Sequence, residues 1–514
     1  MQTVNVLLTA RPQFGRKRPA SLTGFFPVLF TALLVTSISG CALLGGGSFP
    51  TTLKQVSAAT PTERALDIQQ WQTEEGANVL FVRSPTLPML DVRVVFDAGS
   101  ARDGQQEGLA SLTSALFGEG AEGLTVDDIA HGFENLGANF SSGSYRDMAL
   151  VELRTLTDAE FYRPATELFV QAIGTPTFPQ AALDRIRAQT LVGLQRQKQV
   201  PGPQVQRAFN RAVFGDHPYA HDSSGSEASL PNIKRADIEQ FYQQYYAAGN
   251  AVIAMTGDLD LAAAKTLAQK ISATLPRGEH ALSLEKASPP QARIVEHLDF
   301  DSSQTTLMLG QQSIWRGHPD WVALYVGNQI LGGSGFASIL TEEVREKRGF
   351  VYGIGSGVSP MASAGPFTVS LQTANDNADE ALAVTLQLVR DYIASGPSQE
   401  QLDNARNDII GSFPLSIAEN DQIVGQLGSI GFYGLPLDYL TWFENEVRSL
   451  TVEEVRAALQ RNIHPETLAI VSVGPVAPEI PGASSDLGSE RAAPISNSAD
   501  SSDSQNSGEQ AAKK

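Results

Sequence analysis

The sequence is poor in the side chains that hold metals or form covalent links. It has one cysteine, Cys41, and seven histidines in 514 residues. A single cysteine excludes a disulfide within the chain. The histidines never occur in the spacings H-x-x-E-H or H-E-x-x-H, which place two imidazoles on one helix face. The sequence also lacks the G-x-S-x-G turn that presents a catalytic serine and the G-x-x-x-x-G-K-[ST] loop that binds phosphates.

Basic residues are also scarce. Lys and Arg total 37 against 56 Asp and Glu, which gives a net charge of -19. Nucleic acids and anionic lipid surfaces are bound through clustered cations, so this charge argues against either as a partner. The length indicates two or more domains.

The only basic cluster lies at the N-terminus. Arg11 and residues 16–18 precede an apolar run at 25–35, which is short for a membrane span and has the order of a secretory signal peptide. The ending Ile-Ser-Gly-Cys at 38–41 resembles a bacterial lipobox, in which Cys41 becomes the lipid-bearing first residue. We therefore expect a lipid-anchored, periplasm-facing protein of a Gram-negative cell envelope. Ala42 is not the aspartate that retains lipoproteins in the inner membrane, which favours the outer membrane. The alternative is an uncleaved anchor with a free thiol.

Two histidine arrangements come nearest to a metal site. His131 and Glu134 have part of the required spacing, but Asn135 stands where a second imidazole is needed, which favours an exposed helix face. His217 and His221 lie four residues apart around a proline, so they can share a metal only if that loop curls helically.

The chain reads as two similar α+β units. The first has expected strands at 78–82, 90–96 and 148–154, and helices at 109–117, around 129–136, 160–173 and 179–198. Residues 178–187 resemble 397–406, and residues 251–257 resemble 468–474 at nearly the same offset, which indicates a duplicated domain. We therefore predict these bounds: signal peptide 1–40, tether 41–61, first domain 62–275, linker 276–292, second domain 293–476 and disordered tail 477–514.

One segment of the second unit is richest in functional signals. The glycines Gly332, Gly333 and Gly335 predict the start of a helix that ends in cations and Gly349, which suits a left-handed cap. The glycines can bind an anion at a helix start, although close packing of the loop is the favoured use. A short apolar strand follows. Because the chain reverses at Gly349, Arg345 on the helix and Tyr352 on the strand can point into the same space as hydrogen-bond donors to a carbonyl or oxyanion.

The phrase R-E-K-R-G-x-x-Y from Arg345 to Tyr352 resembles the second-half signature of the insulinase/pitrilysin-type zinc metallopeptidases, the inverzincins. A second, partial match is His217-Pro-Tyr219 followed by residues 231–241. The resemblance covers about residues 70–474. It implies two homologous strand-and-helix sandwich halves that close like a clamshell. It also implies that Arg345 and Tyr352 bind substrate opposite the zinc.

The same resemblance locates a zinc site that this chain lacks. The family has G-L-A-H-x-x-E-H, whereas here the residues that follow Gly108-Leu109-Ala110 place Ser111 and Ala115 where the histidines belong and Ser114 where the catalytic glutamate belongs. The third ligand falls near Gly193. None of these side chains is a good zinc ligand, and Ser114 cannot cycle a proton near neutral pH. We therefore expect no catalytic residue for metal chemistry and no metal in this chain.

The family that the sequence resembles includes two-chain members, in which one subunit binds the zinc and the other supplies the arginine and the tyrosine. Our first hypothesis is that this chain is the non-metal subunit of such a heterodimer, with zinc in its homologous partner and peptides as substrates. The alternative is a non-enzymatic peptide-binding or scaffold protein of the cell envelope. A stand-alone hydrolase with an unrecognised site is the third option.

Overall fold

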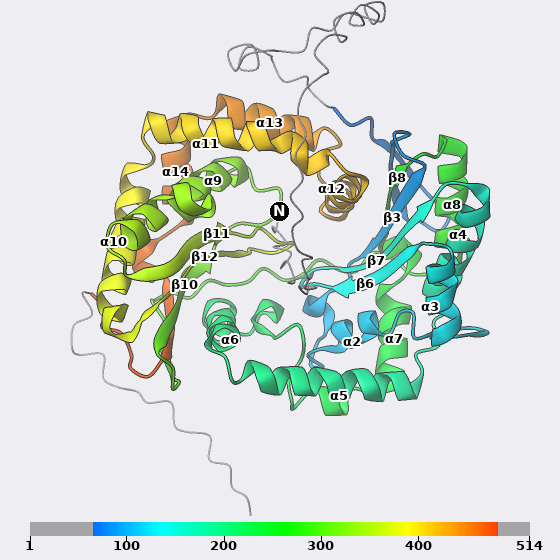
Figure 1. Ribbon diagram of the computed structural model, residues 1–514, viewed down its shortest axis with the longest axis horizontal. Coiled ribbons are helices and arrows are strands. Elements are labelled where there is room, and N and C mark those ends of the chain that lie inside the picture. Colours follow the sequence, from blue (N-terminus) through cyan, green and yellow to red (C-terminus); the bar gives the residue numbers. More distant parts are fainter. Residues whose placement is uncertain (1–64, 482–514) are drawn as a thin grey trace, which may run out of the picture.

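The computed structural model describes residues 65–481. The predicted signal peptide with Cys41, the tether and nearly all of the predicted tail lie outside these residues. The protein has two α+β halves, each built on one mixed sheet with helices packed on it, and the halves face each other (Figure 1). No helix within the described range is both long and apolar enough to cross a membrane.

The first half has a six-stranded sheet. The strand order is β1 (Gln69–Gln72), β2 (Asn78–Arg83), β8 (Ala251–Gly257), β3 (Met89–Phe96), β7 (Ala149–Leu156) and β6 (Asn139–Ser144). Only β2 and β8 are parallel. A two-stranded ribbon of β4 (Gly120–Ala121) and β5 (Leu124–Thr125) lies beside it. Its helices are α2 (Leu109–Ala115), α3 (Val126–Asn135), α4 (Ala159–Gly174), α5 (Gln180–Gln197), α7 (Arg235–Tyr245) and α8 (Leu261–Thr274).

The second half repeats this topology. Its sheet runs β9 (Val295–Asp299), β13 (Ala469–Gly474), β10 (Gln304–Gln312), β12 (Pro366–Ala374) and β11 (Val351–Val358), and again only one pair, β9 with β13, is parallel. The order matches β2-β8-β3-β7-β6 strand for strand. The helices are α9 (Trp321–Asn328), α10 (Ala378–Ser395), α11 (Gln399–Ser412), α13 (Tyr439–Ser449) and α14 (Val452–Asn462).

Two arginines show how closely the halves correspond. Arg187 on α5 contacts the carboxylate of Asp184 and donates to the carbonyl of Ile233, just before α7. Arg406 on α11 contacts Asp403 three residues earlier and donates to a backbone carbonyl just before α14. The similar sequences at 178–187 and 397–406 therefore make the same contacts, which supports the predicted duplication.

One helix of each half packs on the sheet of the other half. Helix α6 (Pro201–Phe214) packs on β10 and β13 of the second sheet, while α12 (Asn420–Phe432) packs on β2, β3 and β8 of the first (Figure 1). The contact is close at two glycines. A Cβ on Gly310 would lie 2.8 Å from the ring of Phe209 on α6, and one on Gly431 would lie 2.4 Å from Val252 of β8. One core cluster therefore joins α12 to β2, β3 and β8 of the first half, and another joins α6 to β13 of the second, while a third lies wholly within the first half.

The segment between Gly332 and Arg348 differs from expectation. The sequence predicts one helix after the glycines, but the structure has a π-helical turn at Gln329–Gly333, a 3₁₀ turn at Gly335–Ala337 and a second π-helical turn at Thr341–Glu346. The glycines close the preceding helix instead of opening the next. A Cβ on Gly332 would lie 2.6 Å from the backbone nitrogen of Ser356, so this loop packs directly on β11. This agrees with the expectation from the sequence that these glycines serve close packing of the loop.

Candidate functional site

Arg345 and Tyr352 are brought together by a tight reversal of the chain. Gly349 has φ +65°, the left-handed conformation that glycine adopts without strain. Tyr352 follows as the extra residue of a β-bulge, because Val351 pairs with Thr373 while Gly353 pairs with the neighbouring Gln372. A bulge redirects a side chain out of the strand pattern, and Tyr352 is 84 % exposed.

The two cations that follow Arg345, Lys347 and Arg348, both contact the carboxylate of Glu343. Glu343 accepts from Lys347 at 2.6 Å and from Arg348 at 2.7 Å, and these hydrogen bonds hold the pKa of its carboxyl below the usual range. Arg345 contacts Glu346 at 3.5 Å, and its guanidinium carbon lies 5.6 Å from the centroid of the Tyr352 ring. The pair therefore presents a guanidinium and a phenol at one place beside β11.

Strand β11 forms one edge of the second sheet, as β6 does in the first. An edge strand has backbone N–H and C=O groups without a neighbouring strand on one side, so it can pair with an extended peptide. Figure 1 shows β11 and β6 on the facing sides of the two halves. The Arg345–Tyr352 pair thus lies beside a backbone that is able to bind peptide.

The expected zinc positions are split between two helices in contact. Ser111, Ser114 and Ala115 lie on α2, and Gly193 lies on α5. Ser111 is half-buried and Ala115 is exposed, while a Cβ on Gly193 would meet no heavy atom within 4 Å. Among residues 65–481, no group of three or more His, Cys, Asp or Glu side chains is arranged to hold a metal. The side chains at these positions do not fit zinc.

Ser114 is buried. Its hydroxyl interacts with that of Tyr246, and neither has another hydrogen-bond partner among the described residues. Burial raises the pKa of Tyr246 above its ordinary value, and the Ser114 hydroxyl partly opposes that rise. Ser114 therefore lies against an aromatic core group, where a glutamate would have to bury its charge.

The start of α2 is held by a buried carboxylate. Asp103 accepts hydrogen bonds from the backbone N–H of Gly108 at 2.8 Å and of Ala110 at 2.7 Å. Burial raises the pKa of Asp103 to about 7, against the effect of these two donors. Asp103 thus holds the start of α2 in place, although the residues of α2 at the expected metal positions are not metal ligands.

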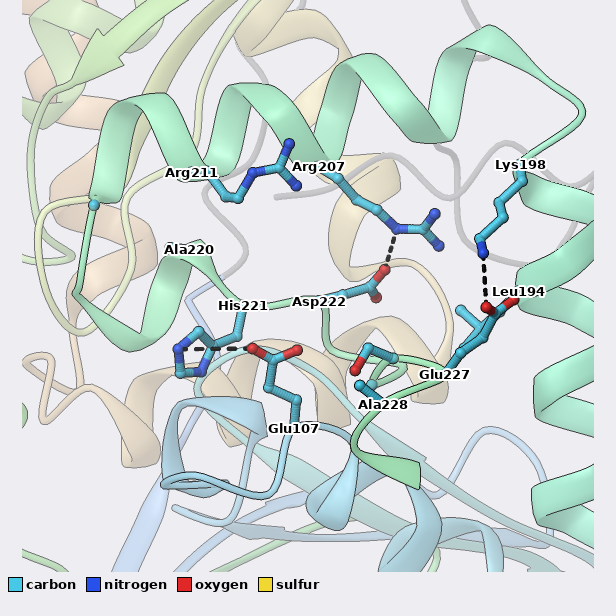
Figure 2. A pocket seen from close by; sticks show the side chains of 13 residues that line it. Glu107, Leu194, Lys198, Arg207, Arg211, Ala220, His221, Asp222, Glu227 and Ala228 are labelled. Atoms are coloured by element: carbon cyan, nitrogen blue, oxygen red, sulfur yellow. Dashed lines mark hydrogen bonds and ion pairs between the residues drawn. The ribbon is translucent and has the colours of Figure 1, made fainter. Parts of the chain in front are cut away.

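A cavity of about 460 Å³ lies between the start of α2, the end of α5 and α6. Figure 2 shows three facing pairs among its side chains: Lys198 with Glu227 at 2.7 Å, Arg207 with Asp222, and His221 with Glu107 at 3.9 Å. Arg211 also lines the cavity and contacts Glu296, outside it, at 3.6 Å. Because the lining has three Lys or Arg side chains and three Asp or Glu side chains, this charged cavity has little net preference for an ionic ligand.

The histidine arrangements do not form a metal site. His217 lines a different cavity, and its Nε2 lies 2.9 Å from the carbonyl oxygen of Glu285, while burial lowers its pKa. His221 instead faces Glu107 in the charged cavity. His131 is exposed on α3, as the sequence predicts.

Sequence reasoning missed a polar cluster between the halves. The Asp147 carboxylate, in the loop before β7, accepts from the hydroxyls of Tyr219 and Tyr433 and from the backbone N–H of Ala362. Two of these donors belong to the second half. Burial raises the pKa of Asp147, and the three donors oppose the rise. An aspartate in a short loop carries no sequence signal that it will be buried.

Comparison with known proteins follows the same division into halves. Residues 78–225 match the family described as Insulinase (Peptidase family M16), and residues 232–409 match Peptidase M16 inactive domain. A crystal structure of a peptidase M16 inactive domain from Pseudomonas fluorescens is 45% identical, with a TM-score of 0.78 over 81% of this chain and 100% of that one.

Two Helicobacter pylori proteins are more distant. The non-peptidase homolog YmxG is 26% identical over 77% of this chain and 91% of its own length. The crystal structure of a protease, at 18% identity and a TM-score of 0.74, covers 80% of this chain and 100% of that one and shows likeness of fold.

Proposed function

Because this chain belongs to the peptidase M16 (insulinase) family, we propose that it is the non-metal subunit of a zinc metalloendopeptidase heterodimer. In this proposal the chain catalyses nothing alone and supplies Arg345 and Tyr352 to peptides bound beside a homologous, zinc-bearing partner. The observation that carries the proposal is the contrast between the two halves: α2 and α5 lack every expected zinc ligand, whereas Arg345 and Tyr352 lie together at an edge strand.

The chemistry of the pair suits peptide hydrolysis by a partner. A guanidinium donates hydrogen bonds and accepts none, and a phenolic O–H can donate one hydrogen bond to an oxyanion. Such donors stabilise the negative charge that develops on a scissile carbonyl oxygen when water attacks it. The attacking water and its metal belong to the partner in this scheme, and no metal step is assigned to this chain.

The location is part of the proposal. A lipid on Cys41 would hold the pair at the envelope membrane on its periplasmic side. Attachment of this kind would come from the N-terminus, where residues 38–41 resemble a lipobox. Radiolabelled palmitate incorporation into the chain, and its loss in Cys41→Ala, tests the anchor independently of the activity.

The decisive experiment is co-purification of the full chain from its native membrane, followed by metal analysis and peptide hydrolysis. We expect a homologous chain with an H-x-x-E-H motif, zinc in proportion to that partner, and hydrolysis only by the pair. A purified single chain that binds stoichiometric zinc and cleaves peptides would overturn the proposal.

A peptide-binding or scaffold function without hydrolysis is the second candidate. The positions of β6 and β11 at the edges of their sheets favour it, because an edge strand can pair with an extended peptide whether or not zinc is near. The two candidates differ in one result: if the native complex contains no zinc-bearing homologue and still binds peptides, the scaffold function is correct.

A further inference from the structure

The second half lacks counterparts of two elements of the first half. In the first half, strand β1 pairs with β2 at the edge of the sheet, and helix α8 packs on β2 and α4. The counterpart of β2 is β9, because β9 pairs in parallel with β13 as β2 does with β8. Among residues 65–481, no strand lies between α8 and β9, and no helix follows β13. Strand β9 is therefore the outermost strand of its sheet and lacks the cover that β2 has.

The pairing registers give the equivalent positions of the two strands. Asp299 at the end of β9 pairs with Gly474, as Arg83 at the end of β2 pairs with Gly257. These two glycines end the similar segments of the repeat, so they are equivalent. Asp299 therefore stands where the first half has Arg83, and the charge at this end of the edge is reversed.

The side chains of β9 fit a strand without such a cover. Val79 and Phe81 of β2 are fully buried in the core that includes α8. Counting back from the equivalent glycines, Val295 and His297 take their places on β9. Val295 is 52 % exposed, and Nδ1 of His297 lies 2.8 Å from the hydroxyl of Ser472. A polar contact and an exposed valine thus replace two core positions.

The backbone of β9 can accept one more strand. Ile294 and Phe300 flank β9 and hydrogen-bond β13, so every second residue between them also faces β13. The N–H and C=O groups of Val295, His297 and Asp299 consequently point away from it. No residue among 65–481 hydrogen-bonds these groups. In the first half, β1 pairs with β2 at the equivalent edge.

The charges at this edge favour a cationic partner. From Val295 to Ser303 the chain has three acids, Glu296, Asp299 and Asp301, and no lysine or arginine. Glu296 contacts an arginine of α6 at 3.6 Å, whereas no lysine or arginine of residues 65–481 forms an ion pair with the other two acids. The side chain of Asp299 is 96 % exposed. An opposite charge on an added strand would therefore be stabilising.

Two other occupants of the edge are disfavoured. A second copy of this chain would bring the same acids together, and like charges across a strand pair are destabilising. Residues 482–514 of this chain contain more acids than cations, no aromatic residue and few residues that favour strands. A cationic segment of another protein has neither disadvantage.

We propose that β9 binds an extended basic segment of another protein as an additional antiparallel strand. The register of β1 predicts the sequence of that segment. Trp71 lies opposite Val79 in the first half, so we expect an aromatic residue opposite Val295, whose exposed surface the ring would cover. The residue opposite Asp299 comes four positions earlier in an antiparallel segment, and we expect lysine or arginine there. The site lies at the opposite edge of the sheet from β11, so it does not depend on a zinc-bearing partner.

The test measures binding of blocked peptides to the full chain by calorimetry. The probe is acetyl-Lys-Val-Thr-Val-Trp-Lys-amide, which places its first lysine opposite Asp299 and its tryptophan opposite Val295. A methyl group on the backbone nitrogen of the threonine removes the N–H that faces His297, so it should weaken binding by about tenfold or more. The matched control carries the methyl group on the nitrogen of the first valine, which points away from β9, and should bind nearly as tightly as the probe.

A change of charge tests the position of the site. A peptide with glutamate in place of the first lysine should bind about threefold or more weakly than the probe. Asp299→Lys should reverse this preference, and the exposure of Asp299 makes an effect on folding small. Glu167→Lys, at an exposed position of α4 in the first half, changes the net charge equally and should keep the original preference.

A dissociation constant above about 1 mM for the lysine probe would overturn the proposal. Equal effects of the two methyl groups would show that the probe does not bind as a strand, which also overturns it. Binding with an unchanged preference in Asp299→Lys would mean that the probe binds elsewhere on the chain, and the assignment to β9 would be wrong.

Discussion

The guanidinium carbon of Arg345 lies 5.6 Å from the ring centroid of Tyr352, although one residue ends a helical turn and the other begins an edge strand. The left-handed Gly349 and the bulge at Tyr352 produce this contact, so it depends on backbone conformation and not on a sequence neighbour.

The phenol of Tyr352 has a specific predicted effect. In the chain reconstituted with the proposed zinc-bearing partner, Tyr352→Phe should lower peptide hydrolysis by about a hundredfold or more, because one oxyanion donor is worth about 3 to 4 kcal/mol of activation barrier. Peptide hydrolysis assays measure this effect, and co-purification of the two chains shows whether they still assemble. Tyr245→Phe, on the half-buried side of α7, should change neither result. Unchanged hydrolysis in Tyr352→Phe would refute the assigned role.

Restoring the missing ligands tests the positions assigned to the metal site. The triple variant Ser111→His, Ala115→His and Gly193→Glu should bind one zinc ion per chain, since two imidazoles and a carboxylate on adjacent helices form a common zinc site. Space is available at Gly193. Metal analysis after dialysis measures the gain, and the double variant that keeps Gly193 should bind zinc more weakly. A folded triple variant without zinc would show that the alignment of these positions is wrong.

Asp147 should be important for joining the halves. Asp147→Ala would leave the hydroxyls of Tyr219 and Tyr433 and the N–H of Ala362 without their acceptor. The expected loss is about 3 kcal/mol in the free energy of unfolding, measured by urea denaturation. Asp301→Ala, at an exposed loop position, is the control and should change stability by less than about 0.5 kcal/mol. Equal stabilities would mean that the cluster contributes nothing to the contact.

Asp103 predicts a pH dependence. Its pKa is about 7 in the folded chain and near 3.8 when unfolded, so between these values the unfolded state releases a proton that the folded state keeps. The free energy of unfolding of the chain, relative to Asp103→Asn, should therefore fall as pH rises from about 4 to 7, by at most about 1.4 kcal/mol per pH unit. Urea titrations of both proteins across this range measure the difference. A flat difference would mean that the two backbone donors keep Asp103 ionised throughout.

The elements of the first half and the duplication were predictable because they leave local signals. Alternating β-branched residues mark strands such as 78–83, and the repeated arginine at 187 and 406 marks the same turn of each half. The Arg345–Tyr352 contact was predictable because Gly349 forces a reversal within a few residues.

The exchange of α6 and α12 was not predictable in the same way. Val205, Phe209 and Val213 mark an apolar face on α6, but an apolar face does not identify the sheet that will cover it.

The exchanged helices bear on how the protein is made. The face of the first sheet that α12 covers is apolar, and α12 is synthesised only after most of the second half. A nascent chain that has completed β8 therefore still exposes this surface to the solvent. Truncations that end between the halves keep the first half's own core but leave this apolar surface uncovered, so they should aggregate more readily than the full chain.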